Sequence, residues 1–144
     1  MLESARCLCG TRRSSLFPFV CFTPCALRCA CSLFSLGAKS SMELAKSKLV
    51  CAAVGFHCSF LTKEDAPLLA ATGRPLLFNC AAVDNIFTPE LRGVFEAELK
   101  GKTGTFLDYE GTTHGFGARP EGAVEQTASL KAHKATMEFL KTHA

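Results

Sequence analysis

Two side chains suited to acid–base chemistry follow two neighbouring apolar segments of the chain. Residues 75–83 form a short apolar segment typical of a buried strand, and Asp84 comes directly after it. His114 follows a second strand-like segment, residues 105–109. The carboxyl ends of parallel strands meet at one edge of a sheet, so the two side chains are expected within hydrogen-bonding distance there. A carboxylate can orient a histidine that transfers protons near neutral pH. The residues alone also allow a solvated loop histidine.

The elements that would position this pair alternate between helix and strand. A continuous apolar segment predicts a strand buried on both faces at residues 50–56, and Thr88 followed by Pro89 predicts a helix start. Strands at 50–56, 76–83 and 105–109 are predicted, with helices at 38–48, within 62–72, at 88–100 and at 124–143. This order predicts an α/β fold with a parallel sheet covered by helices.

Three segments closely resemble the dienelactone hydrolase family: HCSF at 57–60, VDNIFTPEL at 83–91 and THGFGARP at 113–120. The resemblance runs from about Leu36 to Ala144 and implies part of an α/β-hydrolase fold. α/β-Hydrolases carry their nucleophile, acid and histidine in that chain order. The resemblance therefore implies hydrolysis of a small-molecule ester or lactone, with His114 as the base and Asp84 as its orienting acid. It implies no cofactor and no metal.

The nucleophile position departs from the family pattern. Leu36-Gly37-Ala38-Lys39 matches the second half of the family motif, which places Ser35 where the family has cysteine and Leu33 where it has glycine. The resemblance assigns an oxyanion donor to the backbone N–H of Leu36. Leu33 adds a Cβ where a tight strand-to-helix turn needs close approach, so we expect a degraded elbow. We therefore predict that the chain hydrolyses esters poorly or not at all. The alternative to a working hydrolase is a catalytically inactive remnant of the family, with a binding role or no independent role.

Three further residues of the family-like segments are candidates for the site. By resemblance, His57 lines the mouth of the site. Arg119 is placed to pair with a substrate carboxylate, and a solvated surface arginine is the alternative. Cys58 is next to His57, but adjacent strand residues point to opposite faces, which disfavours a nucleophile–base pair. Cys58 is expected to be a small buried or loop residue, and Cys80 is expected to lie in the core.

The N-terminal segment differs in composition from the rest. Six of the nine cysteines lie within the first 31 residues: Cys7, Cys9, Cys21, Cys25, Cys29 and Cys31. A disulfide framework, a zinc site using Cys21/Cys25 or Cys25/Cys29, and a targeting peptide within residues 1–36 are the alternatives. Because no strand or helix period continues through it, residues 1–35 are predicted to be irregular and of aberrant or targeting origin. Residues 36–144 are predicted to form the hydrolase-like domain, truncated at its start.

Charge and hydropathy limit the partners. The net charge of +3 comes mainly from the first 40 residues, and no basic face is interleaved with aromatic residues, which argues against nucleic-acid binding. No apolar segment is long enough to span a bilayer, so a cytoplasmic protein without membrane contact is predicted. A short sheet would expose an edge and favour self-association. A third function, a cysteine-rich metal- or partner-binding segment fused to the remnant, also remains open.

Overall fold

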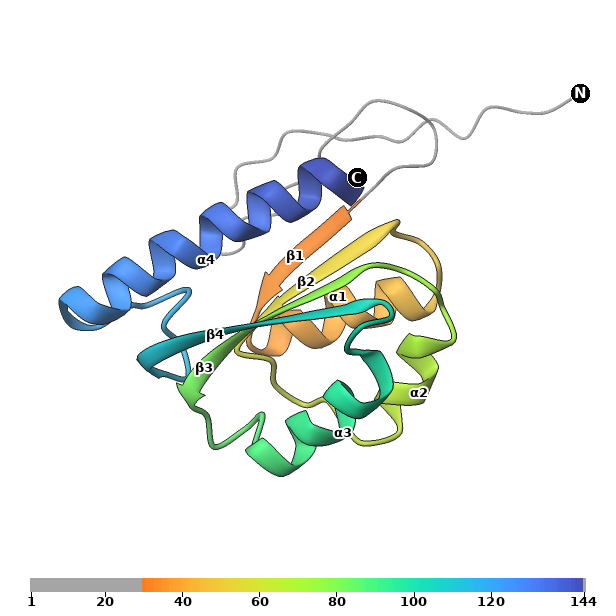
Figure 1. Ribbon diagram of the computed structural model, residues 1–144, viewed down its shortest axis with the longest axis horizontal. Coiled ribbons are helices and arrows are strands. Elements are labelled where there is room, and N and C mark those ends of the chain that lie inside the picture. Colours follow the sequence, from red (N-terminus) through yellow and green to blue (C-terminus); the bar gives the residue numbers. More distant parts are fainter. Residues whose placement is uncertain (1–29, 144) are drawn as a thin grey trace, which may run out of the picture.

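A computed structural model describes residues 30–143, which form a four-stranded parallel sheet with helices on both faces (Figure 1). The spatial order of the strands follows their order in the chain, β1-β2-β3-β4. The elements are β1 (Ala30–Phe34), α1 (Leu36–Lys46), β2 (Ala52–Phe56), α2 (Asp65–Ala70), β3 (Leu76–Val83), α3 (Pro89–Leu99), β4 (Gly104–Thr113) and α4 (Gly122–His143). The predicted α/β class is confirmed.

The strands and helices predicted from residue 38 onward all form. Thr88 caps α3 as expected, because its hydroxyl accepts a hydrogen bond from the amide of Leu91, and Pro89 follows at the first helical position. β4 extends to Thr113, beyond the predicted strand end. Within residues 30–143, no helix combines the length and the apolar character needed to cross a membrane. The cellular compartment stays a prediction.

The strand β1 corrects the prediction for the end of the N-terminal segment. Ala30–Phe34, expected to be irregular, pairs in parallel with β2, with Ala30 opposite Ala52 and Phe34 opposite Phe56. These five residues carry no charge and are buried at the first four positions, which suits a strand covered on both faces. β1 is only five residues long and begins within the cysteine-rich segment, so its local pattern does not set it apart. Residues 1–29 lie outside the described residues, so the predictions for them, including both cysteine pairs, stay predictions.

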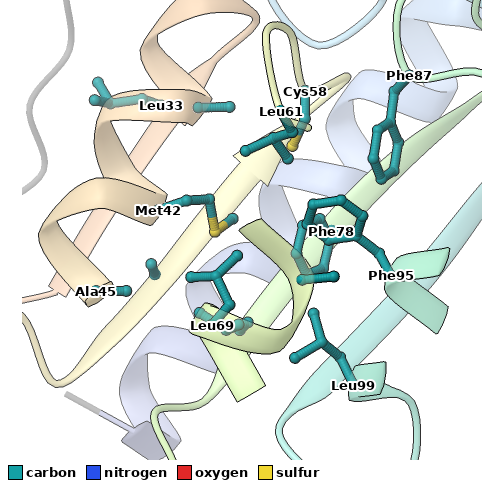
Figure 2. Close-up of a cluster of buried hydrophobic side chains, with 14 of the residues drawn as sticks. Leu33, Met42, Ala45, Cys58, Leu61, Leu69, Phe78, Phe87, Phe95 and Leu99 are labelled. Atoms are coloured by element: carbon teal, nitrogen blue, oxygen red, sulfur yellow. The ribbon is translucent and has the colours of Figure 1, made fainter. Parts of the chain in front are cut away.

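One face of the sheet packs against α1, α2 and α3 (Figure 2). Phe78 of β3 stacks against Phe87 and meets Phe95 of α3 edge-on, with ring centroids 6.2 and 5.9 Å apart. Gly55 of β2 allows the close approach of α1, because a Cβ there would lie 3.1 Å from Cε of Met42 and 3.2 Å from the Cβ of Ala38. Cys58 and Cys80 are both buried in this core, as predicted.

The opposite face is covered by α4 and contains a buried polar network. The hydroxyl of Tyr109 donates to Asn79 Oδ1 at 2.9 Å, and Asn79 Nδ2 donates to Thr136 Oγ1 at 3.1 Å. Buried polar groups without partners are costly, so these bonds favour one register of α4 on the sheet. Burial raises the pKa of Tyr109 to about 12, so the phenol remains a hydrogen-bond donor at neutral pH.

A buried carboxylate joins α1 to α2. Asp65, 4% exposed, accepts hydrogen bonds from Lys39 Nζ at 2.6 Å, Lys46 Nζ at 2.7 Å and the amide of Thr62 at 2.8 Å. Burial alone would raise the pKa of Asp65, but the bonds from the two lysines outweigh it and lower the pKa to about 2. The half-exposed Glu43 bridges the same two lysines. The ionised form of Asp65 therefore stabilises the packing of α1 against α2.

Replacing Asp65 is expected to remove a pH-dependent part of the stability. A carboxyl pKa lowered from 3.8 to about 2 contributes about 2 kcal/mol above pH 4, and this is lost as the pH falls toward 2. Urea unfolding of Asp65→Asn at pH 7 should show this loss, and the difference from wild type should shrink on acidification. Glu43→Gln, at a more exposed position of the same cluster, should cost about 0–1 kcal/mol. Equal stability of Asp65→Asn and wild type at pH 7 would contradict this assignment.

Candidate active site

Three side chains from separate loops form a hydrogen-bonded series at the carboxyl edge of the sheet. Ser35 Oγ lies 3.0 Å from Nε2 of His114, and Nδ1 of His114 lies 2.9 Å from Oδ2 and 3.0 Å from Oδ1 of Asp84. A carboxylate only accepts, so Nδ1 carries the proton and Nε2 of the neutral ring is an acceptor facing Ser35. The predicted approach of Asp84 to His114 is found. Together the three groups can move a proton away from the serine hydroxyl.

Ser35 lies at a sharp turn between β1 and α1. Its backbone has φ 48° and ψ −116°, a region that non-glycine residues rarely occupy. The turn is held on both sides, since the amide of Ser35 donates to the carbonyl of Phe56 at 3.0 Å and its own carbonyl accepts from the amide of Ser59 at 3.2 Å. This is a strained strand-to-helix conformation of the kind that presents a nucleophile.

The elbow forms although Leu33 replaces the expected glycine. Leu33 is buried among the residues of the α1 side, and a Cβ built on Gly37 would lie 3.0 Å from the Cβ of Leu33. The close approach therefore needs only one of the two positions to lack a side chain, and Gly37 supplies it. Ser35 thus keeps its positive φ with the Cβ of Leu33 in place.

Asp84 is fixed in place by its own loop. Its side chain is 5% exposed, and its Oδ1 accepts hydrogen bonds from the amides of Ile86 and Phe87 at 2.9 and 3.0 Å. These bonds form the local turn that aspartate favours at the end of a strand. The carboxylate therefore reaches His114 in one defined orientation.

The loop that carries His114 is held by Glu125 of α4. The carboxylate of Glu125 accepts from the amide and hydroxyl of Thr113 at 2.7 and 2.8 Å, and from the amide of Glu121 at 2.8 Å. The amides of Glu121 and Thr113 lower the pKa of Glu125. Gly117, further along the loop, lies so close to β2 that a Cβ there would be 2.5 Å from the ring of Phe56. Both features fix the position of His114 relative to Ser35.

Ser59 is a member of the site that sequence analysis missed. Its Oγ lies 2.8 Å from the Oγ of Ser35 and 3.4 Å from Nε2 of His114, and the residue is 1% exposed. It lies within the family-like segment 57–60, but neither its residue type nor its spacing distinguishes it from a buried serine. The turn that brings it to Ser35 depends on tertiary packing.

His57 and Arg119 are placed differently from each other. His57 is 2% exposed and packs edge-on against the ring of His114, with centroids 4.8 Å apart. Burial lowers the pKa of His57 to about 4, and the proximity of the second imidazole, His114, acts in the same direction. His57 is therefore buried beside His114, and its place at the mouth of a site and its contact with substrate stay predictions. Arg119 is exposed, which fits both the predicted contact with a substrate carboxylate and the alternative of a solvated surface arginine.

Leu36, predicted by resemblance to be the oxyanion donor, directly follows Ser35, and this role stays a prediction. It is the first residue of α1, where the backbone N–H groups have no acceptor within the helix. Its side chain is 64% exposed, so the apolar group does not cover the turn from outside. A helix N-terminus favours a nearby negative charge, which is the physical reason for predicting a donor at this position.

The described thiols near the site are poor nucleophiles. Burial raises the pKa of Cys58 well above its ordinary value and that of Cys80 to about 12. Cys31 is buried in β1 and its Sγ accepts from Ser41 Oγ at 3.3 Å on the α1 side. The thiolate is the reactive form, so these positions favour Ser35 over a cysteine. Between residues 30 and 143 no three histidine, cysteine, aspartate or glutamate side chains gather closely enough to hold a metal ion.

The model of the dienelactone hydrolase family matches residues 29–144. The chain belongs to the dienelactone hydrolase family. The match begins before Leu36 and includes β1, the strand missed from the sequence. No curated protein matches the chain.

The fold is also shared with a solved enzyme structure. The crystal structure of the Paleococcus ferrophilus monoacylglycerol lipase aligns with a TM-score of 0.63 at 14% identity, over 81% of this chain and 69% of that chain. At this identity the likeness concerns the fold alone. This dienelactone hydrolase family member therefore has the architecture of an α/β-hydrolase.

Removing the carboxylate of Glu125 is expected to loosen the His114 loop. Glu125→Ala leaves the amides of Thr113 and Glu121 without their acceptor, which should cost about 1–3 kcal/mol of unfolding free energy at pH 7. Because the pKa of Glu125 is lowered, its contribution should weaken as the pH falls below the ordinary carboxyl range.

Glu121→Ala is the matched control, since Glu121 is exposed and contributes only its backbone N–H to this cluster. Chemical denaturation should place this control within about 0.5 kcal/mol of wild type. If Glu125→Ala were as stable as Glu121→Ala, the anchoring of the loop by Glu125 would be wrong.

Proposed function

We propose that this dienelactone hydrolase family member hydrolyses a carboxylic ester or lactone, with Ser35 as the nucleophile, His114 as the general base and Asp84 as its orienting acid. The observation that supports the proposal most directly is the 3.0 Å separation between Ser35 Oγ and His114 Nε2 at a turn with positive φ. A serine needs an adjacent base, because its hydroxyl is a weak nucleophile at neutral pH.

In the first step, the Ser35 O–H bond breaks and its proton passes to Nε2 of His114 as Oγ bonds to the carbonyl carbon. The buried carboxylate of Asp84 stabilises the resulting imidazolium through Nδ1. The tetrahedral intermediate collapses when the C–O bond to the leaving alkoxide breaks and His114 gives that oxygen its proton. Water then repeats the sequence on the acyl-serine, releasing the acid and restoring the Ser35 hydroxyl.

The oxyanion formed in both steps needs preorganised donors. The amide of Leu36 is one, since α/β-hydrolases use the N–H after the nucleophile. The second donor in that fold comes from a loop after an earlier strand, and within residues 30–143 the first strand is β1, which leads into Ser35 itself. Removal of one such donor costs on the order of 10²–10³ in rate. We expect turnover that depends on Ser35, His114 and Asp84.

The alternative is an inactive family remnant, which the sequence predicts from the Cβ of Leu33 at the elbow. The positive φ of Ser35, found with Leu33 in place, argues against that alternative. Arg119, exposed in the loop after His114, is proposed to pair with a carboxylate on the substrate, which its planar guanidinium binds through two hydrogen bonds.

Aryl-ester turnover tests the proposal. Wild type should hydrolyse a generic aryl ester above background, and Ser35→Ala or His114→Ala should each lower kcat at least about 10³-fold. The double variant should be no slower than either single one, because members of a triad act as a unit. Asp84→Asn should also be strongly impaired, since it removes the carboxylate that orients the ring and balances its charge.

Cys58→Ala is the control for a cysteine nucleophile. It is expected to retain wild-type turnover, because burial keeps that thiol protonated. Turnover abolished by His114→Ala but retained in Ser35→Ala would reject Ser35 and favour a thiol instead. Background rates in wild type would favour the inactive remnant.

A further inference from the structure

A second hydroxyl reaches the Ser35–His114 pair from a strained loop. Ser59 lies between two non-glycine residues with positive φ, His57 at 35° and Phe60 at 60°. Such backbone conformations cost roughly 1–3 kcal/mol each and persist only where the surrounding structure imposes them. Here they bring Ser59 Oγ to 2.8 Å from Ser35 Oγ.

The direction of each hydrogen bond in the series follows from the carboxylate. Asp84 can only accept, so Nδ1 of His114 donates to it and Nε2 must accept. The hydroxyl of Ser35 therefore donates to Nε2, and its oxygen keeps lone pairs free to accept. The hydroxyl of Ser59 supplies the matching donor, at 2.8 Å from Ser35 against 3.4 Å from His114.

The geometry points to Ser59 as a positioning residue that donates a hydrogen bond to Ser35 Oγ and keeps the Ser35 O–H directed at Nε2 of His114. This inference rests on the proposed function of Ser35. Ser59 is not itself the nucleophile, because it is 1% exposed and lies farther from the base than Ser35 does. It acts on the reaction through Ser35.

Ser59 keeps its own proton throughout the proposed step. The O–H bond that breaks is that of Ser35, whose proton passes to His114, and the bond that forms joins Ser35 Oγ to the carbonyl carbon. One lone pair of Ser35 accepts from Ser59 while another forms the new bond. Ser59 therefore orients the attacking oxygen. Its loss is expected to lower kcat and to leave KM unchanged.

Ser59→Ala isolates the hydroxyl, because the backbone N–H that donates to the carbonyl of Ser35 remains. With an aryl ester, kcat is expected to fall about three- to tenfold, as for one lost hydrogen bond, with KM unchanged. Ser41→Ala is the matched control: Ser41 is fully buried, but its hydroxyl contacts Cys31, away from the triad. This control should keep the wild-type kcat.

Two substitutions of nearly the same shape separate the effect of the Ser59 hydroxyl from the effect of packing at that position. Ser59→Thr and Ser59→Val place nearly the same volume in the buried site, and only Thr keeps a hydroxyl. We expect the Thr variant to exceed the Val variant in kcat by the same three- to tenfold factor. This comparison stays decisive if the Ala variant fails to fold.

Phosphonylation of Ser35 by an alkyl fluorophosphonate, followed by intact mass, reports its nucleophilicity without turnover. Labelling should be slower in Ser59→Ala and Ser59→Val than in wild type and Ser59→Thr. Equal labelling and equal kcat across the Thr and Val variants would overturn the role of Ser59 and leave Ser35 as the nucleophile. No labelling and no turnover in wild type would reject the proposed function, and the role of Ser59 with it.

Discussion

The backbone of Ser35 is held in a positive-φ conformation that the rest of the site requires. A non-glycine residue in this region costs about 1–3 kcal/mol, so neighbouring bonds must hold it there. Two come from β2 and the loop after it: the carbonyl of Phe56 accepts from the Ser35 amide, and the amide of Ser59 donates to the Ser35 carbonyl. The parallel pairing of β1 with β2 brings these groups together. The position of the Ser35 hydroxyl therefore depends on the register of two strands.

The same dependence explains how the other two side chains reach Ser35. Asp84 and His114 follow β3 and β4, which pair in parallel, and each loop is tied by its own hydrogen bonds. The anchors differ in kind: Asp84 binds amides of its own loop, whereas the His114 loop is bound by Glu125 from α4. The buried network of Asn79, Tyr109 and Thr136 fixes α4 on the sheet. The position of His114 therefore also depends on how the last helix packs against the sheet.

Much of this arrangement was predictable from local patterns. Uninterrupted apolar segments identified β2 and β3, and Thr88 with Pro89 identified the start of α3, because these signals involve residues close in sequence. The approach of Asp84 to His114 followed from the rule that parallel strands end at one edge.

The features missed from the sequence depend on contacts between distant segments. β1 is short and is recognisable mainly by its pairing with β2. The tolerance of Leu33 depends on the missing side chain of Gly37, and Ser59 reaches Ser35 through a turn that no local pattern predicts. Pairing, mutual packing and loop strain are not visible in composition or period.

A serine at the elbow also changes how the site would respond to oxidants. A catalytic thiolate is oxidised stepwise to sulfenic and sulfinic acids, and the later products are not readily reduced. A hydroxyl does not undergo these reactions, and the raised thiol pKa values of Cys58 and Cys80 keep those neighbours in the less reactive form. The hydrolysis proposed for Ser35 would therefore persist at peroxide concentrations that inactivate family members with a catalytic cysteine.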